Sequence, residues 1–200
     1  MELLDEISAK GYAIADVGSV EAYRELSRKF GDLWFEAEIT LKEGRQYGAH
    51  NPRALDFHTD APTANLVGWY AKVPGAPTLL KDLSEISIDE ATVTSLRHVK
   101  CACPATDRKN FSHHPVFDSE GNKARFYYAP WFVQREKALP EHQAALVKFE
   151  KALLPITIQS VTLKPGQALY VDNGRMLHGR NAIPEDSKRL LIRHWVANLK

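Results

Sequence analysis

A histidine and an aspartate two residues apart, His58 and Asp60, together with the distant His178, place the strongest constraint on this chain. Side chains two residues apart on an extended strand point to the same face, so His58 and Asp60 can bind one ion. The fold must then bring His178 back beside that strand. This set is the 2-His-1-carboxylate facial triad of non-haem Fe(II) oxygenases, which leaves three positions of an octahedral iron open. We therefore expect these three residues to be the catalytic metal ligands.

The segment after His178 predicts a strand that carries two arginines on one face. Its β-branched and aromatic content and its alternation are typical of a strand over residues 189–196. One face carries Arg189, Leu191, Arg193 and Trp195, and the other carries Leu190, Ile192 and Val196. The second set is an ordinary core face. Arginines beside a metal need anionic partners, and a spacing of roughly 13 Å on a strand suits two different anions.

In its motifs the chain resembles the taurine dioxygenase and 2,4-dichlorophenoxyacetate dioxygenase family of Fe(II)/2-oxoglutarate enzymes. The matching pieces run in order along the chain and cover about residues 11 to 196. They are Phe30-Gly31-Asp32-Leu33, Phe57-His58-Thr59-Asp60, Gly75 to Asp82, Asp172-Asn173, His178-Gly179-Arg180, Arg189 and Arg193. The resemblance implies that the triad binds Fe(II).

The resemblance also implies roles for three further residues. Arg189 and Thr78 would hold the distal carboxylate of the cosubstrate 2-oxoglutarate, and Arg193 would bind an anionic group of the substrate. Guanidinium groups pair with carboxylates through two charge-assisted hydrogen bonds, and a hydroxyl can add a third. The residues alone leave other interpretations open: an exposed edge-strand arginine for Arg189, a structural ion pair for Arg193, and an ordinary strand threonine for Thr78.

The implied reaction uses O2 as a second cosubstrate, converts 2-oxoglutarate to succinate and CO2, and hydroxylates a C–H bond of a small anionic molecule. That molecule would be a carboxylate, sulfonate or phosphonate, amino-acid-like compounds included. Arg125 and Tyr127 are predicted to share a strand face and to help bind it, although a solvated face is the alternative. Asp60 favours hydroxylation over halogenation, because related halogenases carry a small residue there. Desaturation, epoxidation and cyclisation share the same ligands and stay open.

Two readings from other classes remain at this point. The first is a non-enzymatic jelly roll that senses a metal or 2-oxoglutarate without consuming it. The second is a cupin-like metalloenzyme independent of 2-oxoglutarate, which would leave Arg189 without a purpose. A substrate tethered to a carrier, or a homo-oligomer, is compatible with the sequence in each case.

Composition limits the class of protein. The 200 residues are 44% hydrophobic and 26% charged, as in a soluble globular protein, and predict a single domain over residues 1–200. A net charge of +1 gives no reason to expect nucleic acid or membrane as a partner. The first ten residues contain no apolar signal region, so we expect a cytoplasmic protein. Cys101 and Cys103 are expected to be reduced strand residues, and His113 and His114 should point to opposite faces of a strand.

The pattern of elements predicts an α+β fold that is mainly antiparallel β. Strands are expected at 11–17, 66–70, 78–82, 161–163 and 167–172, with a hairpin over 111–129 that turns at 118–122. Helices are expected after Ser19, after a capping box at Ser87 to Glu90, and from Pro140. Residues 40–57 are expected to be a loop that covers the site. The family resemblance selects a double-stranded β-helix, or jelly roll, with flanking helices packed on one side.

Overall fold

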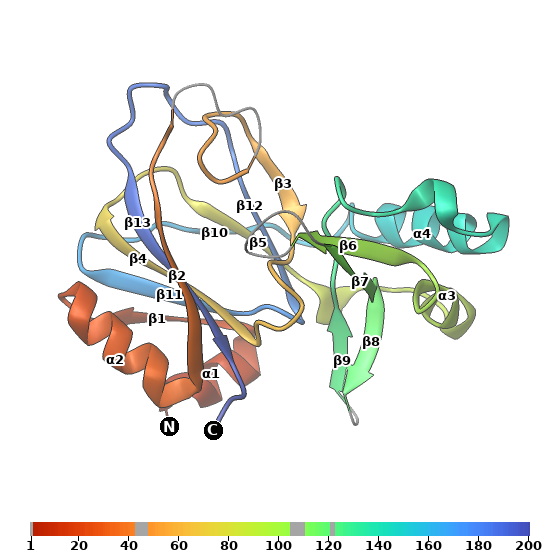
Figure 1. The fold of residues 1–200 in the computed structure, drawn as a ribbon, viewed down its shortest axis with the longest axis horizontal. Helices are drawn as coiled ribbons and strands as arrows, with labels where there is room; N and C mark the ends of the chain where they lie inside the picture. Colours follow the sequence, from red (N-terminus) through yellow and green to blue (C-terminus); the bar gives the residue numbers. More distant parts are fainter. Residues whose placement is uncertain (1, 43–47, 105–110, 121–122) are drawn as a thin grey trace.

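Two antiparallel sheets face one another and form the core of the computed structural model, which describes residues 2–42, 48–104, 111–120 and 123–200 (Figure 1). The five-stranded sheet has the order β1 (Tyr12–Asp16), β11 (Gln167–Asp172), β4 (Leu66–Val73), β13 (Leu190–Ala197) and β2 (Asp32–Ile39). The four-stranded sheet has the order β10 (Gln159–Val161), β5 (Thr78–Asp82), β12 (Met176–Arg180) and β3 (Leu55–His58). Neighbouring strands come from distant parts of the chain, as the expected jelly roll requires.

Two helices cover the outer face of the five-stranded sheet, α1 (Glu2–Lys10) and α2 (Val20–Phe30) (Figure 1). Ser19 begins α2 as predicted, because its side chain accepts a hydrogen bond from the backbone N–H of Ala22 at 3.1 Å. Tyr23 and Phe30 are buried between α2 and the sheet. Gly31 follows the helix where the C-terminal segment passes closely, since a Cβ there would lie 2.3 Å from the carbonyl oxygen of Ala197.

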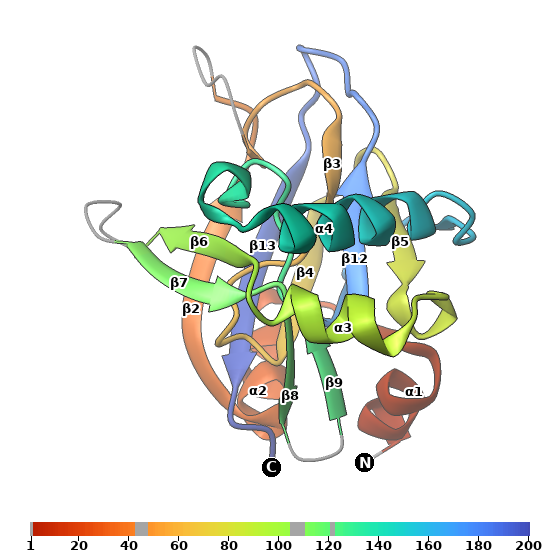
Figure 2. The same cartoon turned by 90° about the vertical axis from the view of Figure 1, so that its right-hand side faces the viewer.

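A second layer of elements lies on the other side of the core (Figures 1 and 2). It consists of η1 (Leu83–Glu85), α3 (Glu90–Leu96), β6 (Lys100–Pro104), β7 (Phe111–Pro115), β8 (Phe117–Glu120), β9 (Lys123–Phe126), η2 (Arg135–Lys137) and α4 (Pro140–Ala152). This segment between β5 and β10 has its own apolar cluster, centred on Leu96, Leu146 and Phe149. The helices therefore flank the core on both sides, and the expectation of one side was wrong.

Several local predictions need correction. The helix after Ser87 begins at Glu90 with Asp89 as its N-cap, because the Asp89 carboxylate accepts from the backbone N–H of Thr92 at 2.6 Å. The expected hairpin over 111–129 is divided between two ladders, since β7 pairs with β6 while β8 pairs with β9. Neither α1 nor β2 was predicted from the sequence.

The expected loop at 40–57 is shorter than predicted, because β3 already begins at Leu55. Residues 43–47 of that loop, and residues 121–122 of the predicted turn, lie outside the described residues. Asn51 is buried, and its backbone carbonyl accepts a hydrogen bond from Arg180. The described part of this segment is therefore held against the core, and closure of a lid over the site stays a prediction.

From Leu191 onward the two faces of β13 match the sequence prediction, but the strand begins at Leu190, so Arg189 lies just before it and not on it as predicted. Leu191, Arg193 and Trp195 face the interior between the sheets, whereas Ile192 and Val196 pack against the cluster beneath α1 and α2. Val67, Leu80, Leu169 and Met176 fill the interior itself. No helix in the described part of the chain is long and apolar enough to cross a membrane.

A polar network ties α2 to the sheet beside this core. His194 is fully buried, and its ring nitrogens lie 2.7 Å from the Ser27 hydroxyl and 2.8 Å from Glu36. Arg24 on α2 forms two parallel hydrogen bonds with the same Glu36 carboxylate, at 2.7 and 2.6 Å. These bonds, together with His194, outweigh burial and lower the pKa of Glu36 from 4.5 to about 2.

The Glu36 network predicts a pH-dependent stability. A carboxyl whose pKa is lower in the folded state stabilises the fold above pH 4.5 and loses that contribution as the pH falls toward 2. Glu36→Gln should lower the free energy of unfolding by about 1 kcal/mol at pH 7. Urea unfolding at pH 7 and pH 3 should show this difference shrinking in acid. Glu38→Gln, an exposed change on the same strand, is the control, and an equal loss at both pH values would contradict the prediction.

Candidate functional site

The structure brings the three predicted ligands together inside the core, beside the end of β3. His58 is the last residue of β3, Asp60 follows two residues later, and His178 on β12 lies directly opposite His58 in the antiparallel ladder. Oδ1 of Asp60 lies 3.9 Å from Nε2 of each histidine. All three residues are buried, and their ligand atoms lie within 4.8 Å of one another, which no other group of three potential ligands achieves within the described residues.

Both histidines are neutral at pH 7. Nδ1 of His58 lies 2.8 Å from the carbonyl oxygen of Asp56. A carbonyl only accepts, so Nδ1 carries the proton and Nε2 keeps its lone pair. Burial lowers the pKa of His58, and burial together with the neighbouring His58 lowers the pKa of His178 to about 3. The two imidazoles are therefore ready to bind a metal without first losing a proton.

Asp60 is an anion held by two residues of β13. Nε1 of Trp195 donates to Oδ2 at 2.7 Å, and the Arg193 guanidinium lies 3.3 Å from both carboxylate oxygens. Burial by itself would raise the pKa of this carboxyl, but Arg193, the two histidines and Trp195 together lower it below its usual value. Two neutral imidazoles and one carboxylate form a donor set that suits ferrous iron. The residues present thus fit the metal that the sequence motif implies.

Asn173 fixes the backbone that carries Asp60. Its side-chain oxygen accepts from the Asp60 backbone N–H at 2.8 Å, and its amide donates to the carbonyls of Ala61 and Ala64, each at 3.0 Å. Asn173 is buried in the turn between β11 and β12. Sequence reasoning placed it in a motif but gave it no role, because its partners lie more than a hundred positions away.

Thr78 and Arg189, the predicted cosubstrate residues, line one cavity with the two histidines and Arg193. The Arg189 side chain is buried and lies along Gly75, where a Cβ would come within 2.7 Å of its Cδ. Burial and the nearby Arg180 lower the pKa of Arg189 to about 10, so it remains a cation at pH 7. Its Nε finds no hydrogen-bond partner among the described residues. A buried cation in this state favours an anionic ligand.

Arg180 is a residue of this cavity that the sequence analysis did not assign. One terminal nitrogen donates to the carbonyl of Arg53 at 2.8 Å, and the other donates to the carbonyl of Asn51. It therefore fastens the segment before β3 to the wall of the cavity while adding positive charge near Arg189. The only signal for this role was the position of Arg180 two residues after His178.

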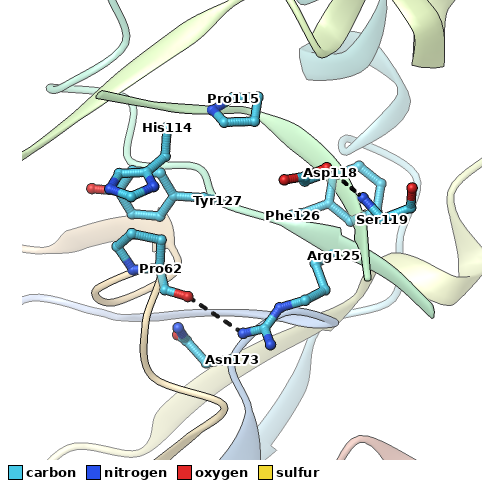
Figure 3. Close-up of a pocket in the computed structure, with 9 residues that line it drawn as sticks. All are labelled: Pro62, His114, Pro115, Asp118, Ser119, Arg125, Phe126, Tyr127 and Asn173. Atoms are coloured by element: carbon cyan, nitrogen blue, oxygen red, sulfur yellow. Dashed lines mark hydrogen bonds between the residues drawn. The ribbon is translucent and has the colours of Figure 1, made fainter. Parts of the chain in front are cut away.

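Arg125 and Tyr127 do not lie in that cavity. They line a separate pocket of about 270 Å³ together with Pro62, His114, Pro115, Asp118, Ser119, Phe126 and Asn173 (Figure 3). Arg125 reaches across it to the carbonyls of Pro62 and Ala64, at 3.4 and 3.3 Å, and the Tyr127 hydroxyl donates to the carbonyl of Ala102 at 2.9 Å. The pocket thus adjoins the loop that follows Asp60. Substrate binding by Arg125 and Tyr127 stays a prediction.

The other polar candidates lie away from the triad. Cys101 and Cys103 are free thiols on β6, as expected of reduced strand residues. His113 and His114 lie on β7 and join no group of three potential ligands among the residues described.

Comparisons with known proteins agree with this geometry. The family model described as Taurine catabolism dioxygenase TauD, TfdA family, matches residues 17–195. This chain belongs to that family. No curated protein matches the chain significantly.

Solved structures share the fold of this family member at low identity. Asparagine oxygenase in complex with Fe(II), 2S,3S-3-hydroxyasparagine and succinate has a TM-score of 0.75 and 16% identity, over 97% of this chain and 77% of that chain. The non-haem iron oxygenase OrfP in complex with Fe and alpha-ketoglutaric acid has a TM-score of 0.73 and 16% identity, over 98% and 77%. A further OrfP complex holds Fe, succinate and (3S)-hydroxy-L-Arg, with a TM-score of 0.75 and 16% identity over 97% and 77%.

Membership of the TauD/TfdA family makes the chain an Fe(II)/2-oxoglutarate-dependent oxygenase, which uses O2 as its other cosubstrate. The prediction of an enzyme is therefore confirmed, and the sensor and cupin-like readings are not supported. The jelly-roll fold class is confirmed as well.

The position of Asn173 predicts a large effect on stability. Asn173→Ala removes three buried hydrogen bonds and should lower the free energy of unfolding of the metal-free protein by about 2–4 kcal/mol. Urea unfolding measures this change. Asn181→Ala, at an exposed position close by in the chain, is the matched control and should have little effect. Similar stability in both variants would show that Asn173 does not hold the 60–64 loop.

Proposed function

We propose that His58, Asp60 and His178 bind Fe(II), and that the enzyme hydroxylates a small anionic molecule with conversion of 2-oxoglutarate to succinate and CO2. The observation that carries this proposal is the convergence of the three buried ligand atoms within 4.8 Å. Bound Fe(II), with 2-oxoglutarate and O2, supplies the oxidation of an unactivated C–H bond. The chain supplies the ligands, their orientation and a dry environment.

Thr78 and Arg189 are proposed to hold the distal carboxylate of 2-oxoglutarate. Their shared cavity opens onto both histidines, and Arg189 is a buried cation. The cavity has a volume of about 30 Å³, so a cosubstrate must move some of the side chains that line it. The segment around Asn51 and Arg53, whose carbonyls accept hydrogen bonds from Arg180, would move together with these side chains when the cosubstrate binds.

Arg193 is proposed to hold the anionic group of the substrate. Its guanidinium lies beside the metal-ligand carboxylate of Asp60 and over the ring of Phe35, 5.6 Å from the ring centroid. The ligands in the asparagine oxygenase and OrfP structures are hydroxylated amino acids, each of which bears a carboxylate. That chemistry supports an amino-acid-like or related carboxylate, sulfonate or phosphonate substrate for this chain.

The remaining tasks fall to residues that shape the site. Neutral His58 and His178 present nitrogen lone pairs, while Trp131 packs on the His58 ring at 4.9 Å between centroids and Trp69 packs edge-on against His178 at 4.8 Å. These rings displace water from the ligands, which strengthens the electrostatic interactions around the anion of Asp60. Water exclusion also limits side reactions of the oxidising site.

An anaerobic absorption titration with Fe(II) and 2-oxoglutarate tests the proposed function. Wild type should develop a metal-to-ligand charge-transfer band, since 2-oxoglutarate would chelate the iron. Asp60→Ala should lose the band at the iron concentration that saturates wild type and should lose substrate oxidation, because one of three protein ligands is missing. The control is Asp56→Ala, which removes an exposed carboxylate on β3, the strand that ends at His58, and this variant should keep the band. A wild type that binds iron without a band would refute the proposal.

The role of Arg189 makes a separate prediction. Arg189→Ala should weaken 2-oxoglutarate binding by about 1.5–3 kcal/mol, a 10- to 150-fold rise in Kd, because a charge-assisted bond is lost. The charge-transfer titration measures this Kd directly. The control is Arg193→Ala, which removes a nearby guanidinium that is proposed to bind the substrate. It should leave the Kd for 2-oxoglutarate close to that of wild type. Equal effects of the two changes would place both arginines at the cosubstrate.

A further inference from the structure

The carboxylate of Asp60 is held asymmetrically. Oδ1 faces Nε2 of both histidines, at 3.9 Å each, while Oδ2 accepts the short hydrogen bond from the Trp195 indole at 2.7 Å. The Arg193 guanidinium lies 3.3 Å from either oxygen. Arg193 therefore neutralises the charge of Asp60 without selecting one oxygen, and Trp195 is the residue that distinguishes them.

The structure fixes the indole of Trp195 firmly in this position. Trp195 is paired with Phe35 across the β13–β2 ladder, and their rings stack at 4.2 Å between centroids with 25° between planes. The ring of Trp34 also lies against this indole, tilted by 47° with 5.1 Å between centroids. The register of this ladder shifts between Trp195, which pairs with Phe35, and Val196, which pairs with Leu33, so Trp34 is the extra residue on β2. On the other side, Asn173 holds the backbone of Asp60.

We propose that Trp195 is a positioning residue that makes Asp60 a ligand through one oxygen only. This inference rests on the proposed Fe(II) site. A carboxylate can bind a cation through one or both oxygens, and an N–H donor on Oδ2 engages the oxygen that would otherwise turn toward the metal. Binding through Oδ1 alone keeps three coordination positions open, which 2-oxoglutarate and O2 require. Partners of this kind orient a ligand and raise its affinity for the metal.

The geometry also divides the work between the two β13 residues next to Asp60. Arg193 is proposed to bind the anionic group of the substrate, so its guanidinium would contact both Asp60 and that group. The indole N–H donates to Oδ2 of Asp60, and the indole ring lies against Phe35 and Trp34. Trp195 therefore keeps the Asp60 carboxylate oriented whether or not Arg193 is bound to the substrate.

The test compares variants that remove or restore the donor. Trp195→Phe retains a ring that can stack on Phe35 but lacks the N–H, whereas Trp195→Gln lacks the ring but carries an amide donor. Co(II) is the probe, because it takes the same ligands, is stable in air on this timescale, and gives visible bands that report its coordination. Trp195→Phe should raise the Co(II) Kd by about 10- to 100-fold and shift those bands. Trp195→Gln should recover part of the affinity and the wild-type band positions.

Controls separate this role from a structural one. Trp34→Phe removes a neighbouring indole that is not bonded to Asp60, and it should bind Co(II) like wild type. Thermal melting of each metal-free variant shows whether it folds. If Trp195→Phe does not melt cooperatively, the Co(II) affinity and band positions of Trp195→Gln are compared with those of wild type instead. Wild-type affinity and spectrum in Trp195→Phe, or equal loss in the Phe and Gln variants, would overturn the inference. Failure of the proposed function would show differently, as absence of the iron–2-oxoglutarate band in wild type itself.

Discussion

The carboxylate of Asp60 is a full negative charge enclosed between two sheets, and the arrangement of the site depends on how that charge is balanced. Burial of an unpaired carboxylate is costly, so the fold must place donors around it. β13 supplies Arg193 and Trp195, the turn after β11 supplies Asn173, and β3 and β12 supply the two histidines. One anion thus joins the five-stranded sheet to the four-stranded sheet at the end where the cavity lies.

The same end of the core concentrates positive charge. Arg180, Arg189 and Arg193 line one cavity, and the pKa of Arg189 is lowered to about 10 by burial and by Arg180. Like charges held together destabilise the folded chain, and a bound anion would relieve that repulsion. Binding of an anionic cosubstrate there would stabilise the fold in proportion to its affinity. The apolar core around Leu80, Leu169 and Met176 contributes stability that offsets this repulsion.

Sequence reasoning succeeded where chemistry is local. His58 and Asp60 are two positions apart on a strand end, and the Ser19 cap acts within one helical turn, so each could be read from neighbouring residues. The predicted capping box at Ser87 to Glu90 was wrong because Ser87 and Asp89 are both good cap residues, and it is the Asp89 carboxylate that accepts from the Thr92 N–H. β2 was not predicted, although Leu33, Phe35, Ala37 and Ile39 alternate with polar or exposed residues along it.

The sequence by itself determined which residue types the chain offers: the three ligands, two arginines four residues apart at the last strand, and a threonine at the start of another strand. Their order and spacing already indicated the family and its cofactors. Only the tertiary structure decided that Trp195 donates to one oxygen of Asp60 and that Asn173 fixes the loop after Asp60. It also decided that Arg125 lines a pocket separate from the cavity beside the three ligands. The reason is physical. These contacts join residues that are distant in sequence, and their distances are set by the register of strand pairing within each sheet and by the packing of the two sheets against each other.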